Sequence, residues 1–228
     1  MTMKQREVST REGYARWADE YDDYPNPMTA MVDHVLAHAT VDLAGLDLLE
    51  LGCGTARNVE RLGATFASYL GIDDCPEMLE VGRARRADPP RVELERRDLR
   101  ADWRLPPGSR DVVLISLVLE HFEDLAPLFR AAHEVVRPGG LLWAIELHPA
   151  LHRQGIGAHI ATAEETLVLP STAHDSEQLA AVLLAGGWEP ETTTDWYATA
   201  ALEERSPKLA RHRGRPVVLE LRARRRET

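Results

Sequence analysis

Hydrophobic residues recur along the chain in short runs that are separated by segments of helical periodicity. This alternation is typical of βαβ units around a mostly parallel sheet. Seven apolar runs predict strands over 46–51, 67–72, 92–94, 112–115, 141–147, 190–197 and 216–221. The run over 112–115 is continuously apolar, as expected of a strand that is covered on both faces. We therefore expect an α/β fold: a Rossmann-like, seven-stranded, mostly parallel sheet with helices on both faces.

Several helices between these strands have recognisable ends. A capping-box pattern at 74–77 predicts a helix that runs to about Ala87. Apolar residues at helical spacing over 125–136 predict another helix. Ser176 is expected to cap a further helix over 177–185.

Length and charge narrow the class of protein. The 228 residues suit a single domain over 1–228. The 27 basic and 37 acidic residues give a net charge of −10, which argues against a nucleic acid as partner. The chain has neither an apolar run of membrane-span length nor a signal peptide, and its two cysteines cannot form a disulfide framework. We expect a cytoplasmic protein without a membrane partner, as a monomer or a homodimer.

A glycine-rich turn follows the first predicted strand. Gly52 and Gly54 would let the backbone approach a ligand closely, and the next helix would present free N–H groups. A dinucleotide fingerprint would need a third glycine at position 57, where the chain has Arg57. NAD and FAD are therefore disfavoured.

Acidic residues stand at or just after the ends of the first three strands. Glu50, Asp73 and Asp98 would line the crevice at the carboxyl edge of the sheet, where open α/β sheets bind ligands. Three carboxylates do not suit a polyanion, but they suit a ligand with a ribose diol, an adenine amine and positive charge. S-adenosylmethionine has all three.

The motifs LLELGCGTARN, YLGIDDCPEML, RRDL, VLISLVLEHFEDL and VVRPGGLL resemble, in order and spacing, those of class I S-adenosylmethionine-dependent methyltransferases. The resemblance covers roughly 46–147 and is strongest to the small-molecule branch that includes ubiquinone- and menaquinone-biosynthesis enzymes. It implies that Gly52 and Gly54 approach the methionine moiety with Glu50 beneath, that Asp73 holds the ribose, and that Asp98 and Leu99 hold the adenine. The remaining residues that we assign to the cofactor site on this basis are Asn58, Asp74, Met78 and Ser116. Ala56 stands where the family often has a glycine.

Tyr14, Trp17 and Tyr21 fall on one face of a predicted N-terminal helix. The segment 1–40 resembles the helical lid of small-molecule methyltransferases, whose aromatic faces would attract a sulfonium by cation–π interaction. The alternative is an aromatic stripe that only packs the helix down, which stays open for Trp17. We expect Tyr14 and Tyr21 to face the cofactor, and we assign all three to its site.

Histidines near the ends of the fourth and fifth strands are candidate bases. Methyl transfer needs a base only if the acceptor must lose a proton, and histidine suits that task at neutral pH. We expect His121 to be the leading catalytic candidate and His148 the second, against the alternative that each is a structural hydrogen-bonding residue. The segment 148–175 holds His152, His159 and His174 and is predicted to be an acceptor-side insertion, with a solvated loop as the alternative.

These inferences predict methyl transfer from S-adenosylmethionine to an oxygen or nitrogen of a small-molecule acceptor, with S-adenosylhomocysteine as product. We expect no metal, because the histidine spacing matches no strong ligand motif and Ser116 stands where catechol-type enzymes have carboxylates. The alternatives are methylation of a protein or peptide side chain, and a methyltransferase-like protein that binds the cofactor without turnover.

Overall fold

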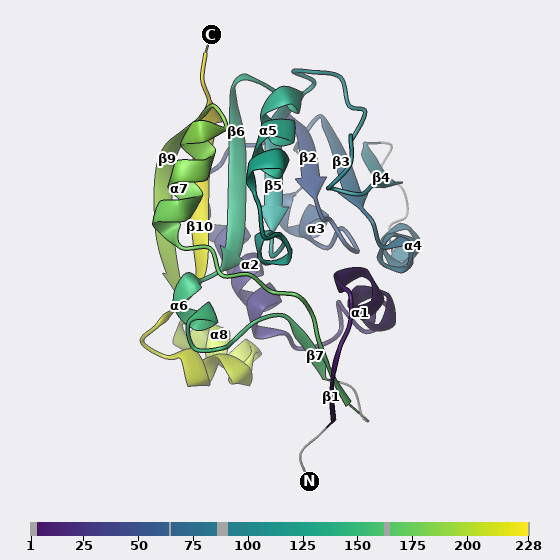
Figure 1. The fold of residues 1–228 in the computed structure, drawn as a ribbon, viewed down its shortest axis with the longest axis vertical. Helices are drawn as coiled ribbons and strands as arrows, with labels where there is room; N and C mark the ends of the chain where they lie inside the picture. Colours follow the sequence, from purple (N-terminus) through teal and green to yellow (C-terminus); the bar gives the residue numbers. More distant parts are fainter. Residues whose placement is uncertain (1–3, 64, 86–90, 162–164, 228) are drawn as a thin grey trace.

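The computed structural model describes residues 4–63, 65–85, 91–161 and 165–227 (Figure 1). Its main sheet has seven strands in the order β4-β3-β2-β5-β6-β10-β9. Neighbouring strands from β4 to β6 pair in parallel, and β10 is antiparallel to both β6 and β9. The prediction of a seven-stranded, mostly parallel sheet is confirmed. The strands are β2 (Asp47–Leu51), β3 (Ser68–Asp73), β4 (Val92–Arg96), β5 (Arg110–Ser116), β6 (Val136–Leu147), β9 (Trp188–Tyr197) and β10 (Pro216–Arg225).

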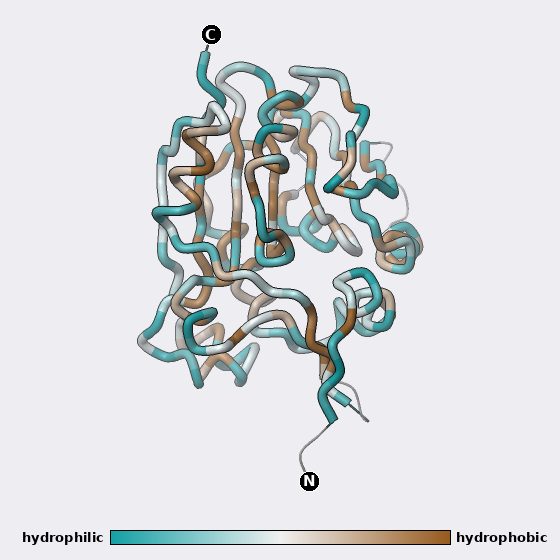
Figure 2. The backbone as a smooth tube through the Cα atoms, in the orientation of Figure 1, coloured by the Kyte–Doolittle hydropathy of each residue, from teal (hydrophilic) through white to brown (hydrophobic). Residues whose placement is uncertain are grey.

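Helices cover both faces of this sheet, with α5 and α7 on the near face in Figure 1 and α2 behind it. Along β5, Val113 and Ile115 pack with α5 and α7, whereas Val112 and Leu114 pack with α2. Side chains of a strand alternate between its faces, so a continuously apolar strand fills both cores. Figure 2 shows these hydrophobic strands enclosed by more polar helices and loops. The helices are α1 (Thr10–Trp17), α2 (Pro27–His38), α3 (Asn58–Leu62), α4 (Pro76–Arg85), α5 (Ala126–Val135), α6 (Pro149–His152), α7 (Ser176–Ala185) and α8 (Ala200–Arg205), with the 3₁₀ turns η1 (Leu119–His121) and η2 (Pro207–His212).

One helix boundary differs in detail from its prediction, and another is not tested. Asp175, and not Ser176, caps α7, because its side chain accepts from the amide of Gln178 while the Gln178 side chain accepts from the Asp175 amide. Helix α4 is described as far as Arg85, so the predicted end at Ala87 lies outside the described residues. Among the described helices, none is long and apolar enough to cross a membrane.

A second, three-stranded sheet was not predicted. It consists of β1 (Lys4–Glu7), β8 (Glu165–Val168) and β7 (His159–Ala161), in the order β1-β8-β7. Strand β1 pairs in parallel with β8 and thereby brings the N-terminal segment onto the segment 148–175. Figure 1 shows β1 and β7 below the carboxyl edge of the main sheet, beside α1. The segment 148–175 therefore contains helix and strand in addition to loop.

Candidate active site

A cavity opens at the carboxyl ends of β2, β3 and β5, and α1 lies across it. We call it the first cavity; its empty volume, including the open mouth, is about 970 Å³. Thirteen of the fifteen residues that the sequence assigned to the site line this cavity: Tyr14, Tyr21, Glu50, Gly52, Gly54, Asn58, Asp73, Asp74, Met78, Asp98, Leu99, Ser116 and His121.

The glycine-rich turn after β2 is left-handed and tightly packed. Gly52 has φ +67° and Gly54 has φ +53°, a region that only glycine adopts without strain. A Cβ on Gly52 would lie 2.5 Å from Cγ2 of Val118, and one on Gly54 would lie 2.9 Å from Cε of Met78. Both glycines line the first cavity, so their missing side chains leave room for a ligand against the backbone.

Glu50 lies beneath this turn and is almost fully buried. One carboxylate oxygen accepts from Nδ2 of Asn58 at 2.7 Å, and the other accepts from the Tyr69 hydroxyl. Among the described residues, Oδ1 of Asn58 is buried and has no hydrogen-bond partner. Since Asn58 lines the first cavity, this oxygen is an acceptor that suits an ammonium group.

Asp73 and Asp98 supply further acceptors at the same edge. The Asp73 carboxylate accepts from the amides of Gly54 and Cys75, both at 2.8 Å, and each oxygen keeps a second lone pair. Burial raises the pKa of Asp73, and the two amide hydrogen bonds partly offset this effect. The Asp98 side chain is exposed and accepts from the amide of Arg100 at 2.8 Å. Both residues line the first cavity.

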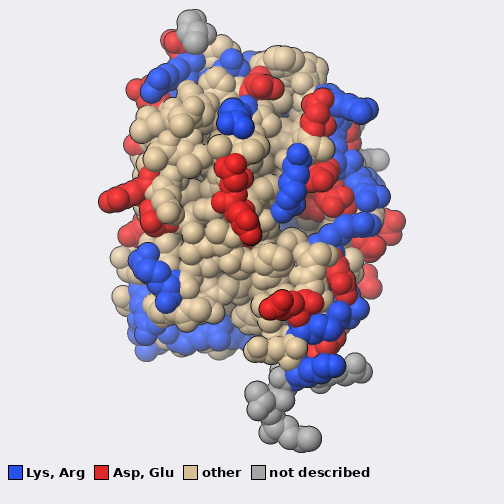
Figure 3. Space-filling view, in the orientation of Figure 1, with Lys and Arg blue, Asp and Glu red and all other residues tan. Residues whose placement is uncertain are grey.

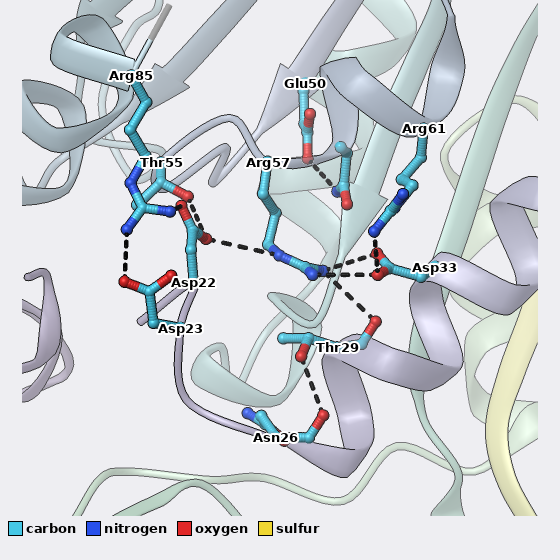
Figure 4. Close-up of polar contacts among 11 residues, drawn as sticks. Asp22, Asp23, Asn26, Thr29, Asp33, Glu50, Thr55, Arg57, Arg61 and Arg85 are labelled. Carbon is cyan, nitrogen blue, oxygen red and sulfur yellow. Dashed lines mark hydrogen bonds and ion pairs between the residues drawn. The ribbon is translucent and has the colours of Figure 1, made fainter. Parts of the chain in front are cut away.

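Arg57 connects the glycine-rich turn to the N-terminal helices (Figure 4). Its guanidinium donates to both oxygens of Asp33 on α2, at 3.0 and 3.2 Å, and lies 3.5 Å from Asp22. Asp22 also accepts from the Thr55 hydroxyl at 2.8 Å and pairs with Arg85 at 3.1 Å. Planar, bidentate pairs of this kind are geometrically specific. The segment after α1 is therefore held against the turn that lines the cavity.

Helix α1 also contacts η1 on the other side of the cavity. Nδ1 of His121 lies 2.9 Å from the Pro170 carbonyl oxygen, which only accepts, so Nδ1 carries a proton. In the neutral ring, Nε2 then accepts from the Tyr14 hydroxyl at 3.1 Å. Removal from water raises the pKa of Tyr14 well above its usual value, and that of Tyr21 to about 12. Tyr14 therefore stays a neutral phenol that can donate to His121.

Trp17 lies outside the first cavity. Its ring centroid is 4.9 Å from that of Tyr21 and 5.5 Å from that of Tyr24, in edge-on contacts. It packs with Leu167 and Leu169 around β8. This placement favours the packing alternative considered for Trp17, whereas Tyr14 and Tyr21 line the first cavity.

His148, the second candidate base, also lies outside the first cavity. Its Nδ1 accepts from the amide of Ala150 and caps α6, while Nε2 lies 3.1 Å from Asp195 on β9. Both ring nitrogens are engaged, because Pro149 starts a helix immediately after β6 and turns the ring toward it. These contacts favour the alternative considered for His148, a structural hydrogen-bonding residue.

Glu146 was not singled out in the sequence. It is buried near the end of β6 and accepts from the amides of Val118 and Leu119, with its two oxygens at 3.0 and 3.2 Å from Val118 N. Burial, reinforced by the nearby charge of Glu120, raises its pKa to about 8. The sequence signal that could have identified Glu146 is that it is the single acidic residue inside the apolar run 141–147. Glu146 supports the turn that leads to His121.

Arginines near the cavity were also missed as site residues. Arg11, Arg57 and Arg100 line it, and Arg100 stacks 4.4 Å above the Phe122 ring while donating to the His121 carbonyl. Their spacing in the sequence carries no signal, since each reaches the cavity from a different element. Within the described ranges, no group of three or more His, Cys, Asp or Glu side chains could hold a metal ion.

Comparisons with known proteins agree with this geometry. A methyltransferase domain family matches residues 49–144. The ubiquinone biosynthesis O-methyltransferase of Methylobacterium sp. (strain 4-46) is 32% identical over 160 residues, which cover 67% of this chain and 63% of that protein. The protein of the same name from Methylocella silvestris is 31% identical over 167 residues, covering 70% and 54%. The chain thus spans between half and two thirds of the length of these relatives.

A solved structure is similar to this one over most of the chain. The crystal structure of an S-adenosylmethionine-dependent methyltransferase from Mesorhizobium loti has a TM-score of 0.70 and 25% identity, covering 88% of this chain and all of that one. The chain belongs to the class I S-adenosylmethionine-dependent methyltransferases, as the resemblance of its motifs implied. The cofactor of this family is S-adenosylmethionine.

Proposed function

We propose that the chain transfers a methyl group from S-adenosylmethionine to an oxygen or nitrogen of a small molecule. The observation that carries the proposal is that one cavity holds both the glycine-rich turn with its acceptors and the Tyr14–His121 pair. The relatives named above are O-methyltransferases, which favours oxygen as the acceptor atom.

The first cavity has the groups that this cofactor requires. The unpartnered Oδ1 of Asn58, with the Glu50 carboxylate behind it, suits the ammonium of the methionine moiety. Asp73 would accept from the ribose hydroxyls, and Asp98 would accept from the adenine amine beside Leu99. When bound, S-adenosylmethionine supplies an electrophilic methyl group on a positively charged sulfur. Asp74, Met78 and Ser116 would complete the walls.

The aromatic residues of the segment 1–40 would cover the cofactor as a lid. Tyr14 and Tyr21 line the first cavity, and their rings lie 6.1 Å apart between centroids. The faces of such rings attract a cation, and their bulk excludes water from the reacting atoms. The contacts of Asp22 and Asp33 with Arg57 would hold this lid in register with the glycine-rich turn.

The Tyr14–His121 pair would take the proton that an acceptor hydroxyl loses. The acceptor O–H would donate to the Tyr14 oxygen, while the Tyr14 proton moves to Nε2 of His121. The acceptor thereby loses one proton, Tyr14 remains a neutral phenol, and His121 gains one charge. The Pro170 carbonyl keeps the other ring nitrogen protonated, so that Nε2 is the nitrogen available.

The test is release of S-adenosylhomocysteine by the purified chain with a panel of small phenols, alcohols and amines. We expect turnover with at least one class, and a decrease in kcat of ~10²–10⁴ in His121→Ala, the usual contribution of a general base. His148→Ala serves as the matched control and should retain activity. Binding of S-adenosylhomocysteine without turnover on any acceptor, peptides included, would instead support a non-catalytic role. A kcat in His121→Ala within ~3-fold of the parent would remove His121 as the base.

A further inference from the structure

A second cavity adjoins the first and shares three of its wall residues. Tyr14, Tyr21 and Leu117 line both, and the second cavity has an empty volume of about 950 Å³, including its mouth. Its other walls are mainly apolar or aromatic: Trp17, Tyr24, Met28, Ile156, Ile160 and Leu169. A ligand in this cavity would lie beside Tyr14, whose hydroxyl contacts His121 in the first cavity.

Two cations stand on one side of this cavity. Lys208 and Arg211 both come from η2 and both line it. Lys208 Nζ lies 4.3 Å from the centroid of the Tyr24 ring and 2.5 Å from its hydroxyl. Nε of Arg211 donates to Nε2 of His212 at 3.1 Å. Within the described part of the chain, neither cation has a carboxylate at ion-pair distance, whereas the nearby Arg213 pairs with Glu203.

The segment around Lys208 and Arg211 adds further positive charge. Residues 205–215 hold five Lys and Arg residues and no Asp or Glu, in a chain whose net charge is −10. Figure 3 shows blue atoms along the lower left edge, where α8 lies in Figure 1. Glu120 is the acidic residue among those that line the second cavity. Its carboxylate accepts from the Ser171 hydroxyl and from the Ala158 amide, so it is already engaged.

His212 adds a buried donor to the same wall. It lines the second cavity and is 2% exposed. Because Nε2 accepts from Arg211, the neutral ring carries its proton on Nδ1, which has no hydrogen-bond partner among the described residues. Burial and the charges of Arg211 and Arg215 lower the pKa of His212. A buried donor without an acceptor is costly, and two cations beside an apolar surface attract an anion.

We propose that the second cavity binds the methyl acceptor, and that this acceptor has an apolar, ring-containing body and an anionic group held by Lys208 and Arg211. A carboxylate and a phosphate share the required chemistry. This inference rests on the proposed function for the identity of the ligand as the acceptor, but the anion site itself does not depend on turnover.

The experiment compares two fluorescent probes of similar shape, with the first cavity filled by saturating S-adenosylhomocysteine. One is anionic, 1-anilinonaphthalene-8-sulfonate, and the other, N-phenyl-1-naphthylamine, is neutral. We expect the double variant Lys208→Gln/Arg211→Gln to bind the anionic probe at least ~10-fold more weakly, the usual loss on removing charge-assisted hydrogen bonds, and the neutral probe within ~2-fold of the parent. Arg205→Gln is the matched control, since Arg205 is exposed and lines neither cavity. It should bind both probes like the parent.

Equal affinity of parent and double variant for the anionic probe would overturn the proposal, as would an equal loss for both probes. Displacement of the anionic probe by benzoate or by phenyl phosphate would show which anion the site takes. Displacement by neither would also overturn the proposal. Titration of the double variant with S-adenosylhomocysteine should match that of the parent. If neither protein binds S-adenosylhomocysteine, the proposed function is contradicted. The comparison of the two probes, repeated without S-adenosylhomocysteine, then still tests the anion site.

Discussion

The Tyr14 hydroxyl lies 3.1 Å from Nε2 of His121, although 107 residues separate them in the chain. The contact joins α1 to η1 across the first cavity. Helix α1 has its own support, because Ser9 caps it and Gly13 packs so closely on Leu169 that a Cβ would lie 2.9 Å from that side chain. The position of His121 relative to α1 thus depends on the segment 148–175 as well as on the N-terminal segment.

Tyr14→Phe should distinguish a role of Tyr14 in positioning His121 from a role in proton transfer. The variant keeps the ring but loses the hydroxyl that donates to Nε2 and that we propose to accept the proton of the methyl acceptor. We expect kcat to fall by ~10-fold or more, and the KM for S-adenosylmethionine to stay within ~3-fold, because the proton transfer is lost while the ring remains. Steady-state kinetics over a pH series measures this.

Tyr21→Phe is the matched control, since it removes a hydroxyl from the same aromatic group without touching His121. It should leave kcat nearly unchanged. Equal kcat values in Tyr14→Phe and the parent protein would contradict the role of the Tyr14 hydroxyl.

Asp73→Asn tests the assignment of the ribose ligand. The amide keeps the size of the side chain but replaces one acceptor oxygen by a donor. We expect S-adenosylhomocysteine to bind ~10–100-fold more weakly, equivalent to ~1.5–3 kcal/mol for a hydrogen bond to a charged group. Asp19→Asn, at an exposed position, should bind like the parent. Calorimetric titration measures the affinity of each protein for S-adenosylhomocysteine. An unchanged affinity in Asp73→Asn would show that the ribose lies elsewhere.

The main sheet could be predicted from the sequence because a strand that is buried on both faces is continuously apolar, as over 112–115. Each predicted strand falls within a few residues of an observed one. The glycine-rich turn was predictable for a related reason, because it lies within one strand–turn–helix unit. Asp73 and Asp98 lie in two other units, but each stands at or just after the end of a predicted strand. The β1–β8–β7 sheet was not, since its strands have only three or four residues and β1 pairs with a segment about 160 residues away.

Contacts between distant elements explain the other differences. His148 follows β6 at the correct edge, but the start of α6 at Pro149 directs its ring to Ala150 and Asp195. The approach of Lys208 to the second cavity depends on how η2 packs against Tyr24. No local pattern in the sequence encodes either arrangement.

Gly52→Ala and Gly45→Ala distinguish close packing from backbone strain. Both glycines have positive φ, +67° and +72°, but an added Cβ would meet Val118 at 2.5 Å in Gly52→Ala and nothing within 4 Å in Gly45→Ala. We expect Gly45→Ala to lower the free energy of unfolding by ~1–2 kcal/mol, the cost of left-handed backbone. Gly52→Ala should cost more and should also weaken cofactor binding. Urea denaturation and calorimetry measure the two effects, and identical behaviour of the variants would contradict the account.

Glu146 predicts a specific dependence of stability on pH. Its pKa is raised from 4.5 to about 8 in the folded protein, so the unfolded chain releases the proton at lower pH than the folded one. The stability that comes with the bound proton is complete below about pH 4.5 and is lost as the pH rises to about 8. Glu146→Gln stays neutral and should avoid this loss.

We therefore expect the stability of Glu146→Gln relative to the parent to increase by a few kcal/mol, on the order of 2–4, between pH 5 and pH 9. Glu80→Gln, at an exposed position on α4, should show no such trend. Urea denaturation at both pH values provides the comparison. A difference between Glu146→Gln and the parent that does not change with pH would contradict the raised pKa.

Calorimetric titration of the purified chain with S-adenosylhomocysteine tests most directly whether the first cavity binds the cofactor. We expect binding at one site per chain with micromolar affinity, and loss of that affinity in Asn58→Leu, which removes the unpartnered oxygen of a residue that lines the cavity. An absence of binding to the parent chain, or equal binding by Asn58→Leu, would contradict the placement of the cofactor in the first cavity.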